Sequence, residues 1–269
     1  MKKIIVIAVA MVSLGLVFGA ETTDNLQNRA VKIPTKGDFH IYVLMGQSNM
    51  SGRGEIKPVD KVGNPRILML DKDDKWQIAV DPLHFDRPHA AVGLGMSFAG
   101  EMLKDEKTGL SIGLVPCAVG GSPLKKWEKG GDLYVQALDR IEKARKIGTL
   151  KGVLWHQGET DSVKLEWAKS YQRRLEKMIG DFRDALGQRE LVFVVGTLGD
   201  YFKGHKKFVY TELVNHALVK IAEDVNDVGC VYSTGLTDND GVHFDRPSQI
   251  ELGRRYARKM REILNAKKN

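Results

Sequence analysis

Cysteine is scarce in this chain of 269 residues, which holds only Cys117 and Cys230. Two cysteines cannot build the disulfide framework on which small secreted domains depend. Both lie in apolar runs typical of strands, so we interpret them as small buried hydrophobic side chains. A disulfide between them would need Cα atoms within about 7 Å of each other, and the sequence gives no sign of such proximity.

Low-complexity tracts and fixed-period repeats are also absent, which argues against a disordered protein or a solenoid. Hydrophobic residues make up 42% of the chain and charged residues 28%, as in ordinary globular proteins. A chain of this length can bury a substantial core in one large domain or two small ones. Beyond the N-terminus, no apolar run is long enough to cross a bilayer.

The N-terminal residues 1–20, "MKKIIVIAVAMVSLGLVFGA", contain two lysines, an apolar run and then small residues. This order predicts a signal peptide that is cleaved after Gly19 or Ala20, followed by a polar leader over 21–37. The alternative is an uncleaved membrane anchor, but the run is shorter than the roughly 20 residues of a comfortable span. We therefore expect a secreted or periplasmic protein with no stable membrane insertion after cleavage.

The formal net charge is +7, or about +5 without Lys2 and Lys3. Much of the excess lies in the last predicted helix, in Arg254, Arg255, Arg258, Lys259 and Arg261. We interpret these side chains as a solvated helix face; attraction to an acidic polysaccharide or a membrane surface is the alternative. No nucleic-acid-binding motif is present, so we expect no nucleic-acid partner.

Short apolar runs alternate with longer amphipathic stretches along the chain. The runs predict buried strands over 39–46, 66–70, 111–118, 152–158, 191–198 and 229–234. The stretches between and after them predict helices over 93–107, 132–147, 164–186, 207–225 and 248–265. This alternation predicts an α/β fold, with a central parallel sheet covered by helices on both faces, in a single domain over 38–265.

Four polar or glycine-rich motifs follow predicted strands. "GQSNM" follows the first strand, "GGS" the third, "HQGETD" the fourth and "DGVH" the last. In parallel sheets, ligands bind beyond the carboxyl ends of the strands, so these motifs should meet at one edge. Their convergence is stronger evidence for a functional site than any single motif.

Ser48, in "GQSNMSGRG", is the candidate nucleophile. Nearby glycines, Gly46 and Gly52 among them, make a tight turn feasible and allow a substrate to approach the backbone. The hydroxyl of Ser48 could then point into the crevice while its own N–H faces a developing oxyanion. A Ser/Asn turn or a helix cap is the alternative reading of the same residues.

A serine nucleophile needs a base, usually a histidine that is oriented by a carboxylate. "DPLHFDRP" at 81–88 and "DGVHFDRP" at 240–247 both place an aspartate three residues before a histidine. His243 with Asp240 is favoured, because Gly241 permits the sharp turn and the segment leaves the last strand. Proline stiffens the corresponding turn before His84. For both copies, a loop histidine satisfied by its neighbouring aspartate is the alternative.

The tetrahedral oxyanion of acyl transfer needs preorganised donors. The candidates are the N–H groups of Ser48 and Gly121 and the side-chain amide of Gln157, although "GGS" could equally be a plain glycine turn. Glu159 could orient His243 or His156, or cap the segment that follows. Trp76, Trp127 and Trp155 are candidates for stacking on a sugar, with burial in the core as the alternative.

As a set, "GQSNMSGRG", "AVGGSPLKKW", "WHQGETDS" and "DGVHFDRPSQIELGRRYA" resemble the four sequence blocks of the SGNH-hydrolase superfamily. The closest resemblance is to carbohydrate esterases of the group that includes family 6 acetylxylan esterases and sialate O-acetylesterases, and it runs from about residue 38 to 263. It implies a three-layer α/β/α sandwich of flavodoxin-like type. A glutamine replaces the asparagine that most superfamily members carry in the third block, as is typical of this group.

The resemblance also implies residue roles. Ser48 is the nucleophile, His243 the base, and Ser48 N–H, Gly121 N–H and Gln157 the oxyanion hole. The acid partner of His243 is Asp240, with Glu159 sharing or taking that role. Candidate substrate-binding residues are Gln47, Asn49, Arg53, His84, Trp127 and His156, and the first "HFDRP" copy should line the site or pack beside it. Neither a metal nor another cofactor is implied.

We therefore expect an exported serine esterase that removes O-acetyl groups from acetylxylan or a related plant polysaccharide. The compact chain favours this over a sialate O-acetylesterase, because sialate esterases of the group often carry inserted segments. A lipase or thioesterase on the same fold is a further alternative, although no lid-like apolar stretch is present. A non-catalytic carbohydrate-binding protein belongs to a different class, but no element of the catalytic set is missing. The sequence carries no signal for an oligomeric state.

Overall fold

The structure is a computed structural model that describes residues 31–104 and 109–267. The predicted signal peptide, 1–20, and most of the predicted leader therefore lie outside the described residues. The last part of the leader meets the domain at a 3₁₀ turn, η1 (Lys36–Asp38), where the hydroxyl of Thr149 donates a hydrogen bond to the carbonyl of Lys36. Within the described ranges, no helix is long and apolar enough to span a membrane.

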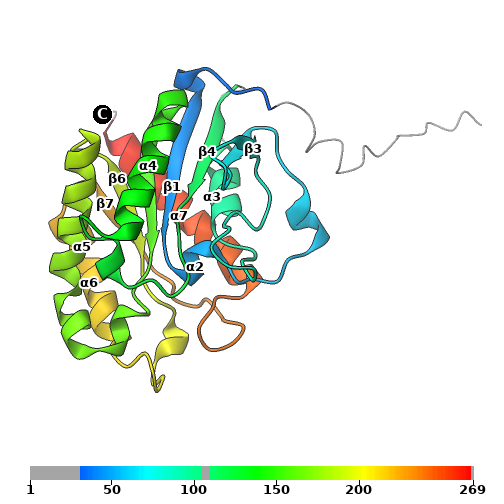
Figure 1. The fold of residues 1–269 in the computed structure, drawn as a ribbon. Coiled ribbons are helices and arrows are strands. Elements are labelled where there is room, and N and C mark those ends of the chain that lie inside the picture. Colours follow the sequence, from blue (N-terminus) through cyan, green and yellow to red (C-terminus); the bar gives the residue numbers. More distant parts are fainter. Residues whose placement is uncertain (1–30, 105–108, 268–269) are drawn as a thin grey trace, which may run out of the picture.

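A seven-stranded sheet forms the centre of the described domain (Figure 1). Its strands are β1 (Phe39–Gly46), β2 (Ile67–Leu70), β3 (Trp76–Ile78), β4 (Ser111–Pro116), β5 (Thr149–His156), β6 (Val192–Gly196) and β7 (Val228–Val231). Their spatial order is β3-β2-β4-β1-β5-β6-β7. All neighbours are parallel except β3, which pairs antiparallel with β2 at the sheet edge.

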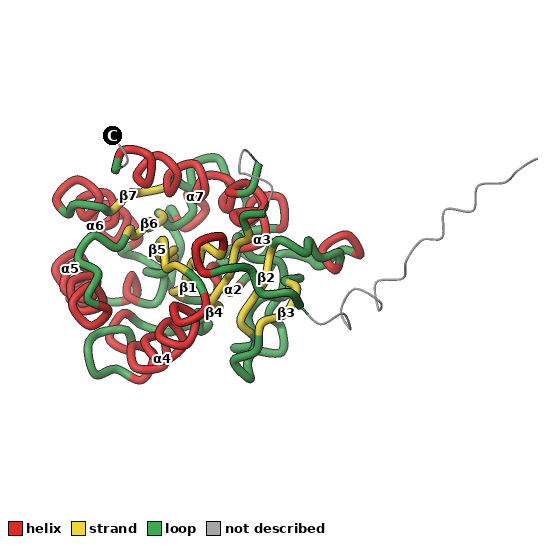
Figure 2. Tube along the Cα trace, turned by 90° about the horizontal axis from the view of Figure 1, so that it is seen from above, coloured by secondary structure: helices red, strands yellow, loops and turns green. Residues whose placement is uncertain are grey.

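Helices cover both faces of the sheet, which confirms the predicted three-layer arrangement (Figure 2). They are α2 (Ser48–Ser51), α3 (Gly95–Met102), α4 (Asp132–Ile147), α5 (Leu165–Leu186), α6 (Thr211–Asp224) and α7 (Arg246–Ala266). The apolar sides of α4, α5 and α6 pack on one face, and α3 and α7 pack together on the other. The short α2 lies at the carboxyl end of β1.

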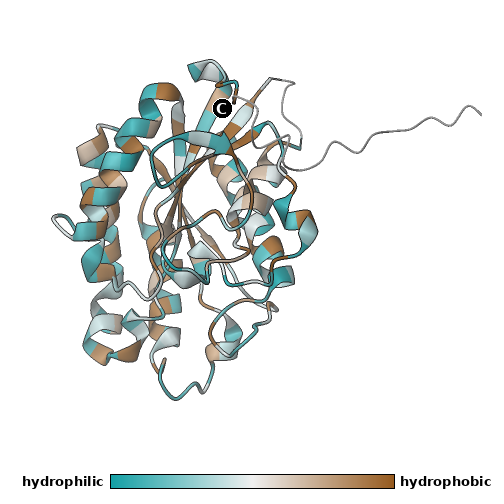
Figure 3. Cartoon of the chain, turned by 45° about the vertical axis from the view of Figure 1, so that its right-hand side comes forward, coloured by the Kyte–Doolittle hydropathy of each residue, from teal (hydrophilic) through white to brown (hydrophobic). Residues whose placement is uncertain are grey.

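Alternation along the strands explains why both faces need helices. In β1, Ile41 and Val43 belong to the hydrophobic cluster under α4, α5 and α6, whereas Tyr42 and Leu44 belong to the cluster under α3 and α7. All four side chains are essentially inaccessible to solvent. Figure 3 shows the same pattern, with hydrophobic residues concentrated on the sheet and hydrophilic ones on the outer helix surfaces.

The six predicted strands are all present. The structure differs from the prediction in one additional strand at the sheet edge and in the ends of two helices. β3 was not predicted, because it has only three residues, partly or fully exposed, and pairs only with β2. The helix expected from 207 begins at Thr211. The ring Nδ1 of His205 accepts the N–H groups of Lys207 and Phe208, which holds these residues in a loop before the helix. The helix expected over 93–107 is α3, and it ends at Met102.

Candidate active site

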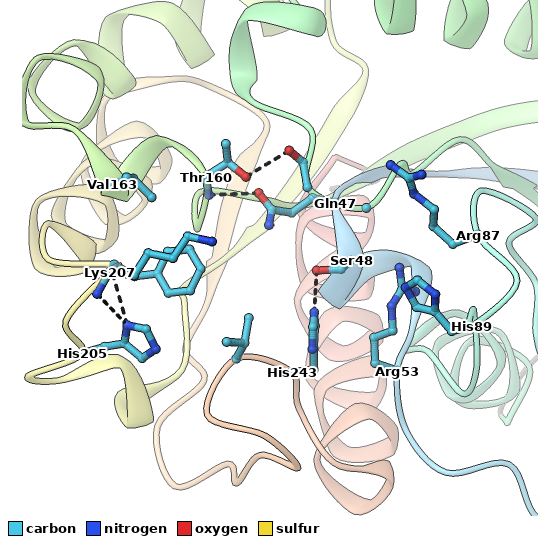
Figure 4. Close-up of a pocket in the computed structure, with 14 residues that line it drawn as sticks. Gln47, Ser48, Arg53, Arg87, His89, Thr160, Val163, His205, Lys207 and His243 are labelled. Carbon is cyan, nitrogen blue, oxygen red and sulfur yellow. Dashed lines mark hydrogen bonds between the residues drawn. The ribbon is translucent and has the colours of Figure 1, made fainter.

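A cavity of about 540 Å³ opens at the carboxyl edge of the sheet (Figure 4). Its lining comes from the segments that follow β1, β4, β5, β6 and β7, together with the segment between β3 and α3. The lining residues are Gln47, Ser48, Arg53, Arg87, His89, Gly120, Gly121, Thr160, Val163, His205, Lys207, Phe208, Val242 and His243. All four motifs seen in the sequence therefore lie at one edge, as predicted.

Ser48, His243 and Asp240 form a continuous hydrogen-bonded series in this cavity. His243 Nε2 lies 3.0 Å from Ser48 Oγ, and His243 Nδ1 lies 2.8 Å from Asp240 Oδ2. Because a carboxylate can only accept, Nδ1 carries the proton and Nε2 is left to accept from the hydroxyl of Ser48. Figure 4 shows the imidazole pointing at the serine. The imidazole is thus in the tautomer that can remove the serine proton.

The turn from 240 to 243 holds the aspartate under the ring. Asp240 Oδ1 accepts the backbone N–H groups of Val242 (3.0 Å) and His243 (2.8 Å), and Gly241 has φ +80°, a left-handed conformation that favours glycine. Partial burial raises the pKa of Asp240, but these N–H groups and the imidazole outweigh burial and hold the pKa below its ordinary value. Asp240 is therefore ionised at neutral pH and can stabilise an imidazolium.

Two backbone N–H groups are available for an oxyanion beside Ser48. Among the described residues, neither Ser48 N–H nor Gly121 N–H donates to a protein acceptor, and both residues line the cavity. Gly121 has φ +73°, and a Cβ there would meet open space, so the backbone stays accessible. Gly120 N–H, by contrast, donates to Asp86 Oδ2 at 2.7 Å, which anchors this loop.

Gly46 explains how Ser48 reaches the edge. Its φ is +136°, and a Cβ at this position would lie 2.1 Å from the carbonyl oxygen of His156. Only glycine allows β1 to approach the end of β5 so closely. The carbonyl of His156 then accepts the N–H of Gln47 at 3.0 Å, and Ser48 begins α2 on the next residue.

The structure corrects the predicted role of Gln157 in the oxyanion hole. Gln157 is fully buried, and its Nε2 contacts three acceptors: Asp161 Oδ2 (2.7 Å), Ser122 O (3.1 Å) and Gln47 Oε1 (3.2 Å). Tyr171 OH donates to the Oε1 of Gln157. No N–H of this amide is left for a substrate.

Gln47 takes the place in the cavity that was expected of Gln157. Gln47 Oε1 accepts from Gln157 Nε2 and from the N–H of Thr160 (3.3 Å), so the orientation of the Gln47 amide is fixed. In Figure 4 its nitrogen faces the side of the cavity that contains Ser48. The side-chain amide that faces the nucleophile is therefore that of Gln47, and Gln157 orients it.

Glu159 makes no hydrogen bond with His243 or His156 and instead supports the His243 loop through Asn49. Asn49 Nδ2 donates to Glu159 Oε1 (2.6 Å) and to the carbonyl of Val242 (3.0 Å), and Asn49 Oδ1 accepts the N–H of Phe244 (3.0 Å). The backbone on both sides of His243 is thereby fixed. Burial raises the pKa of the Glu159 carboxyl to about 7. Among the acidic side chains that the structure describes, only Asp240 is hydrogen-bonded to the His243 ring.

Three predicted substrate-binding residues are buried away from the cavity, so these predictions are wrong for direct contact. Asn49 is fully buried in the network just described. Trp127 packs edge-on against Trp155, with ring centroids 5.4 Å apart, and its indole N–H donates to Ser122 Oγ. His156 is also fully buried, its Nδ1 is 3.0 Å from Tyr256 OH, and burial lowers its pKa to about 3.

The other predicted sugar-contacting residues are divided between the cavity and its surroundings. Gln47 and Arg53 line the cavity. Trp155 is in the core, and Trp76 packs edge-on against Phe39 at the sheet edge. His84, a fourth predicted substrate-binding residue, is 4% exposed and lies outside the active-site cavity, so that prediction is also wrong for direct contact there. Burial lowers the pKa of His84 to about 4.

The two "HFDRP" copies have different structural roles. In the first, Asp86 holds the "GGS" loop through Gly120. In the second, Asp245 is the N-cap of α7 and accepts the N–H of Ser248, while Arg246 makes a bidentate pair with Asp60. The shared pentapeptide therefore marks no shared chemistry.

A set of basic residues at the cavity mouth was not predicted from the sequence. Arg87 and His89 lie on one side of the Ser48–His243 pair, and Lys207 and His205 lie on the other (Figure 4). Arg87 and Lys207 make no ion pair with another described residue. The loop that carries Lys207 follows β6, so the rule that sites form at carboxyl strand ends could have indicated it.

A nucleophile–base–acid series with two free N–H groups, on an α/β sandwich, defines the class of serine hydrolases. The chain belongs to the family described as carbohydrate esterase, sialic acid-specific acetylesterase, which matches residues 38–262. It is therefore a carbohydrate acetylesterase, a carboxylic ester hydrolase with an SGNH-type fold. Within the described ranges, no group of three or more His, Cys, Asp or Glu side chains is arranged to hold a metal ion.

Known proteins similar to this chain agree with that assignment. A probable carbohydrate esterase of Arabidopsis thaliana is 34% identical over 236 residues, which cover 79% of this chain and 86% of the relative. The crystal structure of the same Arabidopsis protein has a TM-score of 0.77 at 32% identity and covers 85% of this chain and 99% of that one. NanS has a TM-score of 0.71 at 18% identity and covers 87% and 100%, a likeness of fold alone.

Replacing the two candidate acid partners should separate their roles. We expect Asp240→Ala to lower kcat on a small acetyl ester by about 10²- to 10⁴-fold, because the imidazolium loses its carboxylate. Glu159→Gln should stay within about tenfold of the wild type, since the amide oxygen can still accept from Asn49. Steady-state kinetics on both variants measure this, and a larger loss in Glu159→Gln would make Glu159 the acid partner instead.

Glu159 should also make stability depend on pH. The pKa of its carboxyl is about 4.5 in the unfolded chain and about 7 when folded, so its contribution to stability is present below pH 4.5. That contribution is lost as pH rises from about 4.5 to about 7. Urea unfolding at pH 5 and pH 7.5 should show a smaller fall in unfolding free energy for Glu159→Gln than for the wild type. An equal fall in the two proteins would contradict the buried, neutral carboxyl.

Proposed function

We propose that this protein is an exported serine esterase that removes O-acetyl groups from acetylxylan or a related plant polysaccharide. The observation that carries the mechanism is the unbroken series Asp240–His243–Ser48 beside two free N–H groups. The polysaccharide substrate is supported by the compact arrangement of the described residues around one sheet and by a partly open cavity at its carboxyl edge.

The reaction proceeds in two acyl-transfer steps. His243 Nε2 takes the proton of Ser48, and Ser48 Oγ attacks the acetyl carbonyl. The N–H groups of Ser48 and Gly121 and the amide of Gln47 stabilise the oxyanion. The bond between the acetyl carbon and the sugar oxygen then breaks, and the imidazolium protonates the leaving sugar oxygen. Water activated by His243 finally releases acetate from the serine.

A sialate O-acetylesterase is the second candidate, and the cavity mouth favours it. Arg87 and Lys207 are cations without ion-pair partners within the described ranges, and no Asp or Glu is among the residues that line the cavity. These cations could form ion pairs with the carboxylate of a sialic acid. NanS and the Arabidopsis protein resemble this chain in fold without deciding between the two sugars.

Acetate release from acetylated xylan and from O-acetylated sialic acid, at equal enzyme concentration, tests the substrate. We expect faster release from acetylated xylan. The reverse order, together with a selective loss on the sialic acid in Arg87→Ala, would assign the protein to the second candidate. Acetate release from neither sugar would reject both.

Export is part of the proposal and is supported by the lysines, apolar run and small residues of 1–20. The mature protein should begin at Ala20 or Glu21 and occur in the periplasm or the medium. N-terminal sequencing of the exported protein measures this. A start at Met1 in the membrane fraction would instead support the uncleaved anchor.

A further inference from the structure

A second cavity, of about 610 Å³, lies beside the active-site cavity. It is formed by the β2–β3 hairpin and the segment over 82–88, the first "HFDRP" copy. Arg87 lines both cavities, so the two are adjacent. Its volume falls in the range of small-molecule sites in proteins. None of the residues that carry the esterase mechanism lines it.

Phe85 is the exposed aromatic side chain among the residues that line this second cavity. Its side chain is 47% exposed, in contrast to Phe244, its fully buried counterpart in the second "HFDRP" copy. The guanidinium of Arg140 lies over the ring, 5.1 Å from the centroid, and is itself held by Asp74 (2.8 Å) and the carbonyl of Leu70 (2.8 Å). The Phe85 ring is therefore exposed but held in place by Arg140, so the side chain loses less conformational entropy when a ligand stacks on it.

Polar side chains with hydrogen-bonding groups line the same cavity as the Phe85 ring. Gln77 is exposed, and its amide makes no hydrogen bond with another described residue. Lys72 is 71% exposed, and its ammonium makes a long ion pair with Asp73 Oδ1, at 3.8 Å. Arg87 is exposed and lines both cavities. A sugar ring presents an apolar C–H face and a rim of hydroxyl groups. It would match an exposed aromatic ring with amide and cationic donors around it.

We propose that this second cavity is an accessory sugar subsite. It holds a neighbouring unit of a polysaccharide, stacked on Phe85, while Ser48 acts on an acetyl group of the unit in the first cavity. The inference rests on the proposed polysaccharide substrate and extends it, because a free monosaccharide could fill only one of the two cavities. It also gives the first "HFDRP" copy a role of its own, in binding rather than in proton transfer.

The test compares substrates of increasing length. For the wild type, kcat/KM should rise from acetylated xylose to acetylated xylohexaose. In Phe85→Ala, the ratio of kcat/KM on acetylated xylohexaose to kcat/KM on 4-nitrophenyl acetate should fall about tenfold. Phe85→Tyr should restore the ratio. Val135, an apolar side chain on α4 that is 57% exposed, provides the matched control, and Val135→Ala should leave the ratio as in the wild type.

Binding provides a readout that does not depend on ester hydrolysis. Titration of Ser48→Ala with unacetylated xylohexaose should show binding that the additional Phe85→Ala change weakens about tenfold. Equal affinity with and without Phe85, or no binding at all, would overturn the subsite. If the wild type hydrolyses 4-nitrophenyl acetate but releases no acetate from any xylo-oligosaccharide, the polysaccharide substrate fails. The titration still decides whether sugar binds at Phe85.

Discussion

Ser48→Ala is expected to lower kcat on an acetyl ester by about 10³- to 10⁶-fold while the protein stays folded. Removing Oγ removes the only atom that can form the acetyl-enzyme, and water would then have to attack directly. The N–H groups of Ser48 and Gly121 survive the change, so a residual rate above the uncatalysed one should remain. Initial rates on 4-nitrophenyl acetate and the far-ultraviolet circular dichroism spectrum together measure this.

The matched control is Ser162→Ala. Ser162 lies at the same carboxyl edge of the sheet but is fully buried, its hydroxyl donates to the carbonyl of Glu159, and it does not line the cavity. It should keep activity within about tenfold of the wild type. A fluorophosphonate probe should label the wild type and Ser162→Ala but not Ser48→Ala. Near-normal turnover by Ser48→Ala would reject the serine mechanism.

The core of the site followed from the sequence because its chemistry and its position are both encoded locally. A serine esterase needs an aspartate hydrogen-bonded to a histidine that is in turn hydrogen-bonded to a serine. An Asp-x-x-His turn with a glycine in it can supply the first two. Parallel strands bring their carboxyl ends to one edge, so Ser48, Gly121 and His243 had to meet there. The fold followed for the same reason, since buried strands and amphipathic helices have distinct periods.

The orientations of the glutamine and tryptophan side chains could not be predicted, because they depend on contacts with residues far along the chain. Gln47 and Gln157 are chemically alike, and only contacts with Asp161 and Tyr171 decide which amide faces the cavity. Likewise, nothing near Trp127 shows that its ring packs on Trp155. Burial and orientation of single side chains are set by tertiary packing, which local patterns do not specify.

The basic mouth and β3 escaped prediction for a different reason. Lys207 lies in a loop without motif, held by backbone hydrogen bonds to the ring of His205. β3 is too short for any period to be visible, and its existence depends on pairing with β2. The position of the loop after β6 could have indicated that it lies near the site, but the placement of the Lys207 side chain and the pairing of β3 depend on tertiary contacts.

His243→Ala should lose nearly all activity, by about 10³- to 10⁶-fold in kcat, whereas His84→Ala should stay within about tenfold of the wild type on a small ester. His243 Nε2 is the only histidine nitrogen within hydrogen-bond distance of Ser48 Oγ among the described residues. His84 is buried outside the active-site cavity, and its pKa of about 4 keeps it neutral at working pH. Its loss removes packing rather than a proton acceptor.

The melting temperatures of the two variants separate a loss of packing from a loss of proton transfer. His84→Ala leaves a buried void and should lower the melting temperature, while His243→Ala, at 23% side-chain exposure, should change it little. Kinetics measured well below both melting temperatures then compare chemistry alone. A large loss of kcat in folded His84→Ala, with His243→Ala still active, would reverse the assignment of the two copies. The expected outcome places the base in "DGVHFDRP" because only that copy lies within reach of the nucleophile.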